Sequence, residues 1–437
     1  MRRPWCSLPQ ARGRTHSAVS DAALNDLRDA LAAMDDAGVT RATIIGGTAV
    51  VSPALEARIA SVAGSVSRIA GADRYATGLA IAAYAETEAG FSWAKPGLAT
   101  ADDFADALAA APLLGKRQAP LLLSPRAGLS DRMAAALYSR RAAVSGFVCV
   151  GGTVALPAHV RQEALHALVA PHFDINRSMG HVSAIAGFGS RPAGGTAERQ
   201  ACDYVAAQLR SWGYTVTTQD VALPDGKHSR NVIAQHTGTR PEVIVLGAHI
   251  DSKYPSSGAN DNASGVAVTL ELARVLAQAT TTPTVRFIAF GAEEIAGDTA
   301  DDHHFGSRQY VAALSSAENA AISGMVSVDM VGYGSTFNIR SLGTGPQTAV
   351  AAIRTRAWFV GQPLPYLKDP GVYGWSDHEG FERAGIPAAW LEWRDDPVYH
   401  TTRDTASHVQ ASRVRVTGRL LRGWVLGMDG ARLDAPR

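Results

Sequence analysis

The chain has 437 residues, enough for two domains that each bury a hydrophobic core. Its formal net charge is +1 and 19% of its residues are charged, so no overall field favours nucleic acid or a membrane surface as a partner. No apolar run approaches the ~20 residues that a membrane-spanning helix needs. We therefore expect neither nucleic-acid binding nor a membrane span.

Residues 1–23 are basic and remain unassigned. They lack the apolar stretch of a secretory signal peptide, so we expect either a protein that stays inside the cell or a start downstream of a missing leader. The cysteines Cys6, Cys149 and Cys202 follow no disulfide or metal motif. The sequence around Cys149 and Cys202 favours buried thiols, and these do not indicate a compartment.

The first part of the chain repeats a pattern of helix, short strand, Gly-Gly turn and proline-initiated helix. One copy includes residues 42–59 and the other includes residues 146–165. Between them, residues 99–124 predict a strand, an acidic helix start, an alanine-rich helix and another short strand. The repetition predicts small α/β units with glycines that allow close packing.

These segments resemble the type-2 cell-wall-binding repeat of Gram-positive surface proteins. Three motifs of that family occur in order, RIAGADRYAT at 68–77, DDFADALAAAPL at 102–113 and VCVGGT at 148–153. The resemblance implies a repeat domain over 24–168, with one complete copy and the back half of another, that binds anionic wall polymers. It also implies a secreted or wall-associated protein. Because one repeat begins halfway, we expect the natural protein to extend upstream. An ordinary small α/β domain without wall affinity is the alternative.

The second part of the chain alternates strands and helices. Residues 169–179 are predicted to be a linker, and 180–430 a second domain. Strands are predicted in segments 215–221, 231–238, 243–247, 285–290, 323–329 and 387–393, and helices in 196–212, 265–278, 346–360 and 407–428. This alternation predicts an α/β fold with a mainly parallel, helix-covered sheet, preceded by the smaller α/β repeat domain.

Polar side chains gather after four of the predicted parallel strands. They are His249, Asp251, Asp261, Glu293, Glu294, Asp329 and His400. Because the carboxyl ends of parallel strands share one edge of a sheet, these groups are expected to converge in one crevice. Unpaired carboxylates there would repel one another and lose hydration, which a divalent metal relieves. Imidazole and carboxylate ligands without thiolate favour zinc over manganese or cobalt.

The same residues resemble the secreted dinuclear-zinc aminopeptidases, the group of aminopeptidase S and aminopeptidase Y. The shared motifs in chain order are HID, NDNASG, AFGAEE, VDM, SDH and YHT. They extend over about 180–430, and they imply a fold of the zinc-dependent exopeptidase type.

The resemblance also implies two zinc ions per chain and a role for each matching residue. Asp261 would bridge the ions, His249 and Asp329 would complete one site, and Glu294 and His400 would complete the other. Glu293 would be the general base that takes a proton from the metal-activated water. Asp251 would orient the ring of His249, and Tyr399 would donate to the oxyanion.

One segment departs from the family pattern. Residues 295–305 lengthen the path from the paired glutamates to the following Gly-Ser motif. The insert contains Asp301, Asp302, His303 and His304, which indicate either a third metal site or a solvated loop on the rim. We expect the solvated loop, because insertions collect at such loops.

The sequence therefore predicts a wall-associated zinc aminopeptidase that hydrolyses peptides with a free N-terminus. Two alternatives remain. One is a glutaminyl cyclase with a single zinc, and the other is a non-catalytic surface adhesin, which would be expected to have lost ligands or the base. The preferred N-terminal residue and the oligomeric state do not follow from the sequence.

Overall fold

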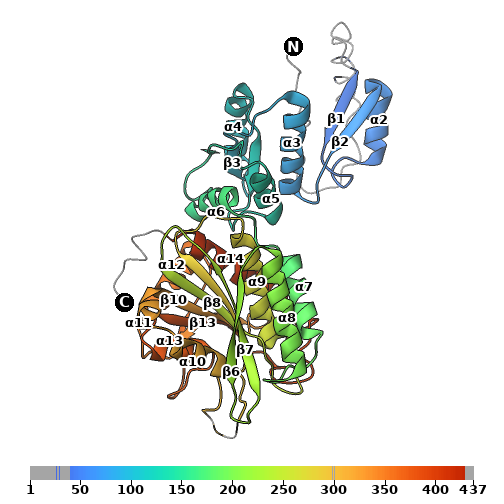
Figure 1. The fold of residues 1–437 in the computed structure, drawn as a ribbon. Coiled ribbons are helices and arrows are strands. Elements are labelled where there is room, and N and C mark those ends of the chain that lie inside the picture. Colours follow the sequence, from blue (N-terminus) through green and yellow to red (C-terminus); the bar gives the residue numbers. More distant parts are fainter. Residues whose placement is uncertain (1–25, 27–28, 30–39, 298, 300, 429–437) are drawn as a thin grey trace. The chain divides into compact units, whose positions relative to one another are not determined.

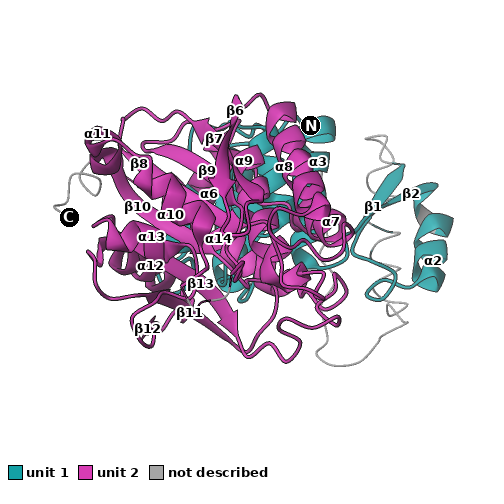
Figure 2. Cartoon of the chain, turned by 60° about the horizontal axis from the view of Figure 1, so that its bottom comes forward, with its two compact units in different colours: residues 1–161 teal, residues 162–437 magenta. Residues whose placement is uncertain are grey.

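The computed structural model describes residues 26, 29, 40–297, 299 and 301–428. The chain divides into two compact units, Met1–Arg161 and Gln162–Arg437, coloured separately in Figure 2. Residues 1–23, with Cys6, lie outside the described residues. No helix in the described ranges has the length and apolar character needed to cross a membrane.

The first unit contains two small parallel sheets. In one, β1 (Arg41–Ile45) pairs with β2 (Ser65–Ile69), and in the other β3 (Gly97–Thr100) lies between β4 (Leu121–Ser124) and β5 (Val148–Cys149). The helices are α2 (Pro53–Ala63), α3 (Arg74–Ala89), α4 (Ala105–Lys116) and α5 (Asp131–Ser139), and α6 (Ala158–Val169) follows β5. Cys202 of the second unit is buried as predicted, but Cys149 is exposed. That prediction was wrong because β5 is a two-residue strand at the edge of its sheet.

The second unit is built on an eight-stranded sheet with the order β12-β11-β13-β10-β8-β9-β7-β6 (Figure 1). The strands are β6 (Val216–Ala222), β7 (His228–His236), β8 (Val243–His249), β9 (Thr284–Phe290), β10 (Ile322–Val328), β11 (Thr336–Ser341), β12 (Tyr366–Lys368) and β13 (Ala388–Arg394). The central strands β13, β10, β8 and β9 are mutually parallel, whereas β7 and β11 run antiparallel to their central neighbours. The predicted mainly parallel sheet is confirmed.

Helices cover both faces of this sheet. The helices are α7 (Ile175–Ala186), α8 (Thr196–Ser211), α9 (Ser264–Leu276), α10 (Phe305–Ala312), α11 (Ser316–Ala321), α12 (Thr348–Phe359), α13 (His378–Arg383) and α14 (Ala411–Leu426). Leu246 of β8 packs into a core with α7, α8, α9, α12 and α14. Its neighbour Val245 packs into another core with Tyr310 of α10 and Phe381 of α13. Because both faces are buried, the central strands are apolar at nearly every position.

The segment predicted as a linker, 169–179, packs within the second unit. Phe173 is 1% exposed in the core of that unit. The Asp174 carboxylate accepts hydrogen bonds from the backbone N–H groups of Asn176 and Arg177, and so caps α7, which begins at Ile175. The polar residues of this segment therefore mark a capped helix start. The predicted boundaries of the two domains stay a prediction.

The start of α9 approaches the end of β10 closely, at the edge of the sheet where the predicted ligands lie. A Cβ atom on Gly265 would lie 1.8 Å from the carbonyl oxygen of Val328, so only glycine fits at this point. The Asn262 side chain links the same elements, because its Oδ1 accepts from the Gly265 N–H at 2.9 Å and its Nδ2 donates to Val328 O at 3.0 Å. The start of α9 is thus held beside Asp329, which directly follows β10.

Candidate metal centre

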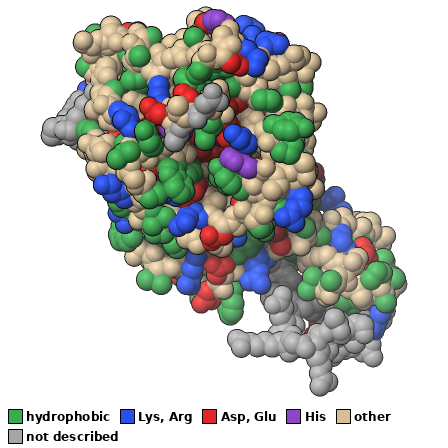
Figure 3. Space-filling model, turned by 90° about the horizontal axis from the view of Figure 1, so that it is seen from below, with side chains coloured by type: hydrophobic (Ala, Val, Ile, Leu, Met, Phe, Trp, Pro, Cys, Tyr) green, Lys and Arg blue, Asp and Glu red, His purple; other side chains and the backbone are tan. Residues whose placement is uncertain are grey.

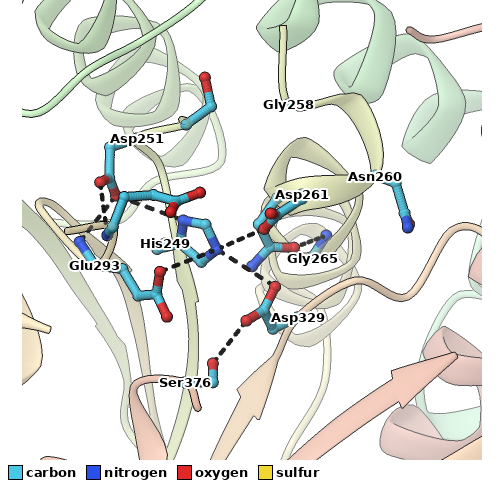
Figure 4. A network of polar contacts seen from close by, with 12 residues as sticks. His249, Asp251, Gly258, Asn260, Asp261, Gly265, Glu293, Asp329 and Ser376 are labelled. Carbon is cyan, nitrogen blue, oxygen red and sulfur yellow. Dashed lines mark hydrogen bonds and ion pairs between the residues drawn. The ribbon is translucent and has the colours of Figure 1, made fainter. Parts of the chain in front are cut away.

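The parallel strands bring the predicted ligands to one edge of the sheet. Figure 4 shows three of them, His249, Asp261 and Asp329, beside Glu293. His249 is the last residue of β8, Asp329 follows β10, and the pair Glu293 and Glu294 follows β9. Asp261 belongs to the short segment η2 (Ala259–Ala263) that leads into α9, and His400 belongs to the loop after β13. All of these elements end or begin at the carboxyl edge, as the sequence predicted.

The carboxylate of Asp261 lies between two histidines. Its Oδ1 is 3.1 Å from Nε2 of His249, and its Oδ2 is 3.0 Å from Nε2 of His400. Asp261 is 5% exposed. One buried carboxylate therefore presents an oxygen to each of two groups of ligands.

The first group contains His249, Asp329 and Glu293. Asp329 Oδ1 lies 3.3 Å from Nε2 of His249, and Glu293 Oε2 lies 3.9 Å from the same nitrogen. The second group contains Asp261, Glu294 and His400, and Glu294 Oε1 lies 3.0 Å from Nε2 of His400. In each group the potential ligand atoms lie within 4.8 Å of one another. The structure therefore brings all five predicted metal ligands together and sets the predicted general base beside them.

The charges of this crevice favour a bound cation. Burial raises the pKa of Glu293 well above its ordinary value, with help from the charges of Asp329 and Glu294. Burial alone would lower the pKa of His400, but its contacts with Asp261 and Glu294 raise it to about 10. Asp329 Oδ1 is buried and accepts no hydrogen bond. Carboxylates outnumber imidazoles here, and this oxygen and nitrogen donor set fits zinc.

Asp251 supports the paired glutamates. It is fully buried, and its two oxygens accept the backbone N–H groups of Glu293 at 3.1 Å and Glu294 at 3.0 Å. Its Oδ1 lies 3.5 Å from Nδ1 of His249, which is longer than an ordinary hydrogen bond. Asp251 thus lies beside His249 as predicted, but its hydrogen bonds go to the turn after β9.

Tyr399 lies against the second ligand group. Its ring stacks on the ring of His400 at 3.7 Å between centroids, and 49% of the residue is exposed. Loss of hydration around the partly buried phenol, together with the negative charges of Asp261 and Glu294, raises its pKa above the usual range. The hydroxyl therefore remains protonated and available as a donor.

Two residues that the sequence did not single out hold the Asp261 segment in place. Asp404 is fully buried and accepts the backbone N–H groups of Asn260 at 2.7 Å and Asp261 at 3.2 Å. On the other side, the buried guanidinium of Arg191 donates to the carbonyl oxygens of Ile250 at 2.8 Å and Gly258 at 3.1 Å. Asp404 lies only four positions after the predicted ligand His400. This closeness in the sequence was the signal that could have pointed to Asp404.

Strained backbone surrounds the ligands. Four non-glycine residues adopt a positive φ of 53–57°, namely Ala292, His304, Met330 and His400. Ala292 precedes Glu293, Met330 follows Asp329, and His400 is itself a predicted ligand. Such left-handed conformations cost energy and collect where the surrounding structure must place a side chain for function.

The insert after Glu294 is not a wholly solvated loop. Asp301 is exposed, but His303 and His304 are 8% and 3% exposed. The expectation of a solvated loop was therefore wrong for the two histidines. The backbone N–H of His304 donates to Glu293 O at 2.8 Å, and that of Phe305 donates to Ala292 O at 2.8 Å. These bonds fold the end of the insert back onto the turn that carries the paired glutamates.

Apolar side chains are exposed on the loops near this edge. Figure 3 shows acidic and histidine side chains set among hydrophobic ones on the face seen from below. Exposed hydrophobic residues of the loops that follow β8, β9 and β13 are Tyr254, Ile295 and Tyr399. These three apolar residues therefore lie on loops that leave the same edge of the sheet as the ligands.

Comparison with known families gives two matches. Peptidase family M28 matches residues 231–425, and cell wall binding domain 2 matches residues 68–161. Both resemblances predicted from the sequence motifs are confirmed.

The chain also resembles individual known proteins. The chain is 35% identical over 191 residues to Aminopeptidase YwaD of Bacillus subtilis. This alignment covers 41% of this chain and 40% of that protein. The chain therefore spans less than half the length of this relative. A zinc aminopeptidase from Bacillus subtilis has a TM-score of 0.53 at 21% identity, covering 58% of this chain and 94% of that one. A glutaminyl cyclase from Bacteroides thetaiotaomicron also has a TM-score of 0.53, at 22% identity, covering 60% and 100%. At these identities the likeness shows the fold alone.

Proposed function

Because residues 231–425 form a peptidase family M28 domain and residues 68–161 a cell wall binding domain 2, we propose that the chain is a wall-associated aminopeptidase that uses two zinc ions. The observation that supports this most directly is the position of Asp261, whose two oxygens face His249 and His400. Asp261, Glu294 and His400 alone could hold a single zinc, so the support for a second ion is the further group of His249 and Asp329 beside Asp261.

We assign the ligands as the sequence predicted. His249 and Asp329 would hold one zinc, Glu294 and His400 the other, and Asp261 both. Bound zinc polarises a substrate carbonyl and makes water acidic enough to attack at neutral pH. The buried acidic crevice would also hold the free amino group of a peptide, because that group is cationic.

The remaining chemistry belongs to the protein side chains. Glu293 faces the crevice and takes a proton from the attacking water, then passes it to the departing amine. Tyr399 keeps its proton and donates a hydrogen bond to the oxyanion that forms on the substrate carbonyl. Asp251 holds the backbone of Glu293 and Glu294, and so positions the base and a ligand together.

A panel of aminoacyl-p-nitroanilides tests the proposed activity. The full chain with zinc should release nitroaniline from free aminoacyl substrates, and it should not act on N-acetylated ones. A chelator should abolish the release, and added zinc should restore it. A glutaminyl cyclase would instead release ammonia from peptides with N-terminal glutamine and leave the peptide bonds intact. An adhesin would do neither.

The first unit would determine where the enzyme acts. Its cell wall binding domain 2 supports attachment to anionic polymers of a Gram-positive wall. The full chain should sediment with purified walls, and extraction of the anionic polymers from those walls should abolish this. Equal sedimentation with intact and extracted walls would contradict polymer binding.

A further inference from the structure

The imidazole of His304 joins two buried carboxylates. Its Nε2 lies 2.9 Å from Oε1 of Glu293, and its Nδ1 lies 2.9 Å from Oε2 of Glu379. The ring is 4% exposed, and Glu379 is fully buried. Both ring nitrogens are therefore engaged at hydrogen-bond distance, which leaves the ring little freedom to rotate.

Glu379 is itself held firmly at the start of α13. Its Oε2 accepts from Nη2 of Arg308 at 2.7 Å, and its Oε1 accepts from Nε of Arg383 at 2.8 Å. Arg308 also donates to the carbonyl oxygen of Asp301 at 2.8 Å, so the same guanidinium fastens the insert. The chain of contacts runs from two arginines through Glu379 and His304 to Glu293.

The other end of this chain is the proposed general base. Glu293 uses Oε1 for His304, and its Oε2 faces His249 at 3.9 Å. We propose that His304 is a positioning residue that fixes the Glu293 carboxylate, so that Oε2 remains turned toward the reacting water. This role rests on the proposed function, which makes Glu293 the base. It also assigns a function to the insert of residues 295–305, because that insert supplies His304.

A third metal ion is the competing explanation, because His303, His304 and Glu379 have potential ligand atoms within 4.8 Å of one another. Two guanidinium groups already bind Glu379, and their positive charges would repel a cation there. A cation would also have to displace a hydrogen bond from His304, whose two nitrogens both face carboxylates. The contacts therefore favour positioning over metal binding.

Three variants of the zinc-loaded full chain test the proposal. His304→Leu removes both ring nitrogens, and His304→Gln keeps a donor near the position of Nε2. His303→Gln changes the adjacent buried residue, whose nearest ring partners are His304 and Tyr373, and serves as the matched control. The measurements are kcat and KM with leucine p-nitroanilide, zinc content, and the crystallographic position of the Glu293 carboxylate.

We expect His304→Leu to lower kcat by about 10- to 100-fold. This is the usual effect of removing a hydrogen-bond partner of a residue that forms the site. KM should stay within about twofold, because substrate contacts do not change. His304→Gln should recover most of the kcat, and His303→Gln should match the wild type. The Glu293 carboxylate should leave its position in the His304→Leu crystal and keep it in the His304→Gln crystal.

Distinct results would overturn the proposal. An unmoved Glu293 carboxylate in His304→Leu, or equal losses of kcat in His304→Leu and His303→Gln, would show that His304 does not position the base. Three zinc ions in the wild type and two in His304→Leu would make His304 a ligand instead. If the wild type hydrolyses no substrate, the proposed function fails, but the crystallographic comparison still decides whether His304 positions Glu293.

Discussion

Asp261 Oδ2 lies 3.0 Å from Nε2 of His400, which belongs to the loop after the last strand of the sheet. The same loop carries Asp404, which accepts the backbone N–H of Asp261. The segment of Asp261 and the loop after β13 are thus joined by two contacts. One is between the predicted ligands Asp261 and His400, and the other is the hydrogen bond from the Asp261 N–H to Asp404. Removal of the second contact should loosen the first.

Asp404→Asn should weaken zinc binding by about 10- to 100-fold, the usual effect of losing a contact behind a metal ligand. Asparagine offers one acceptor where aspartate offers two, so one of the N–H groups of Asn260 and Asp261 would lose its partner. Zinc titration against a competing chelator measures the affinity. Asp225→Asn, in an exposed turn, is the control. Unchanged affinity in Asp404→Asn would show that this contact does not support the site.

Glu293→Gln should lower kcat for leucine p-nitroanilide by at least ~10²-fold, because an amide cannot take a proton from water. Zinc content should stay at the wild-type level, since we assign Glu293 no metal. Glu318→Gln, an exposed glutamate of α11, should leave both quantities unchanged. Undiminished hydrolysis by the Glu293 variant would refute its role as the base, and lost zinc would make it a ligand.

Tyr399→Phe should reduce kcat by about 10²-fold, the usual effect of removing one donor to an oxyanion. Stacking on His400 should persist, because phenylalanine keeps the ring, and zinc content should not change. Tyr254→Phe removes a hydroxyl from a residue that is 76% exposed on the loop after β8, and is the matched control. If both variants behave alike, Tyr399 serves only in packing.

His181 predicts a pH dependence of stability in the second unit. Burial, with help from Arg177, lowers its pKa to about 4, whereas in the unfolded chain the pKa is about 6.5. As the pH falls below 6.5 the unfolded chain binds this proton first, so stability is lost between pH 6.5 and pH 4. The loss from pH 7 to pH 5 is about 2 kcal/mol.

Denaturant unfolding in the presence of a chelator measures this effect without a contribution from zinc. His181→Gln should lose less stability than the wild type between pH 7 and pH 5. An identical pH dependence in His181→Gln would mean that this ring does not remain neutral when folded.

The ligands could be predicted from the sequence because of a simple property of parallel sheets. His249 ends a short apolar strand, Glu294 and Asp329 follow two others, and strands of one direction end at the same edge. The apolar runs also predicted that both faces of the sheet are covered. Local patterns of this kind can be recognised in the sequence even when the paths of the loops are not known.

The supporting residues could not be predicted in the same way. Asp404, Glu379 and His304 act through loops whose paths depend on tertiary packing, and Glu379 meets His304 from 75 positions away in the chain. His303 and His304 were noticed as a pair, but an insert with two aspartates resembles a solvated loop. Burial of the histidines depends on backbone bonds to Ala292 and Glu293, which leave no trace in composition.

Zinc titration of the metal-free full chain, with Asp261→Asn beside the wild type, tests the two-zinc site most directly. Two ions bridged by Asp261 predict two tight equivalents in the wild type and at most one in the variant. The Asp225→Asn control should bind two. A single tight equivalent in the wild type would contradict the two-zinc site and favour the single-zinc cyclase instead.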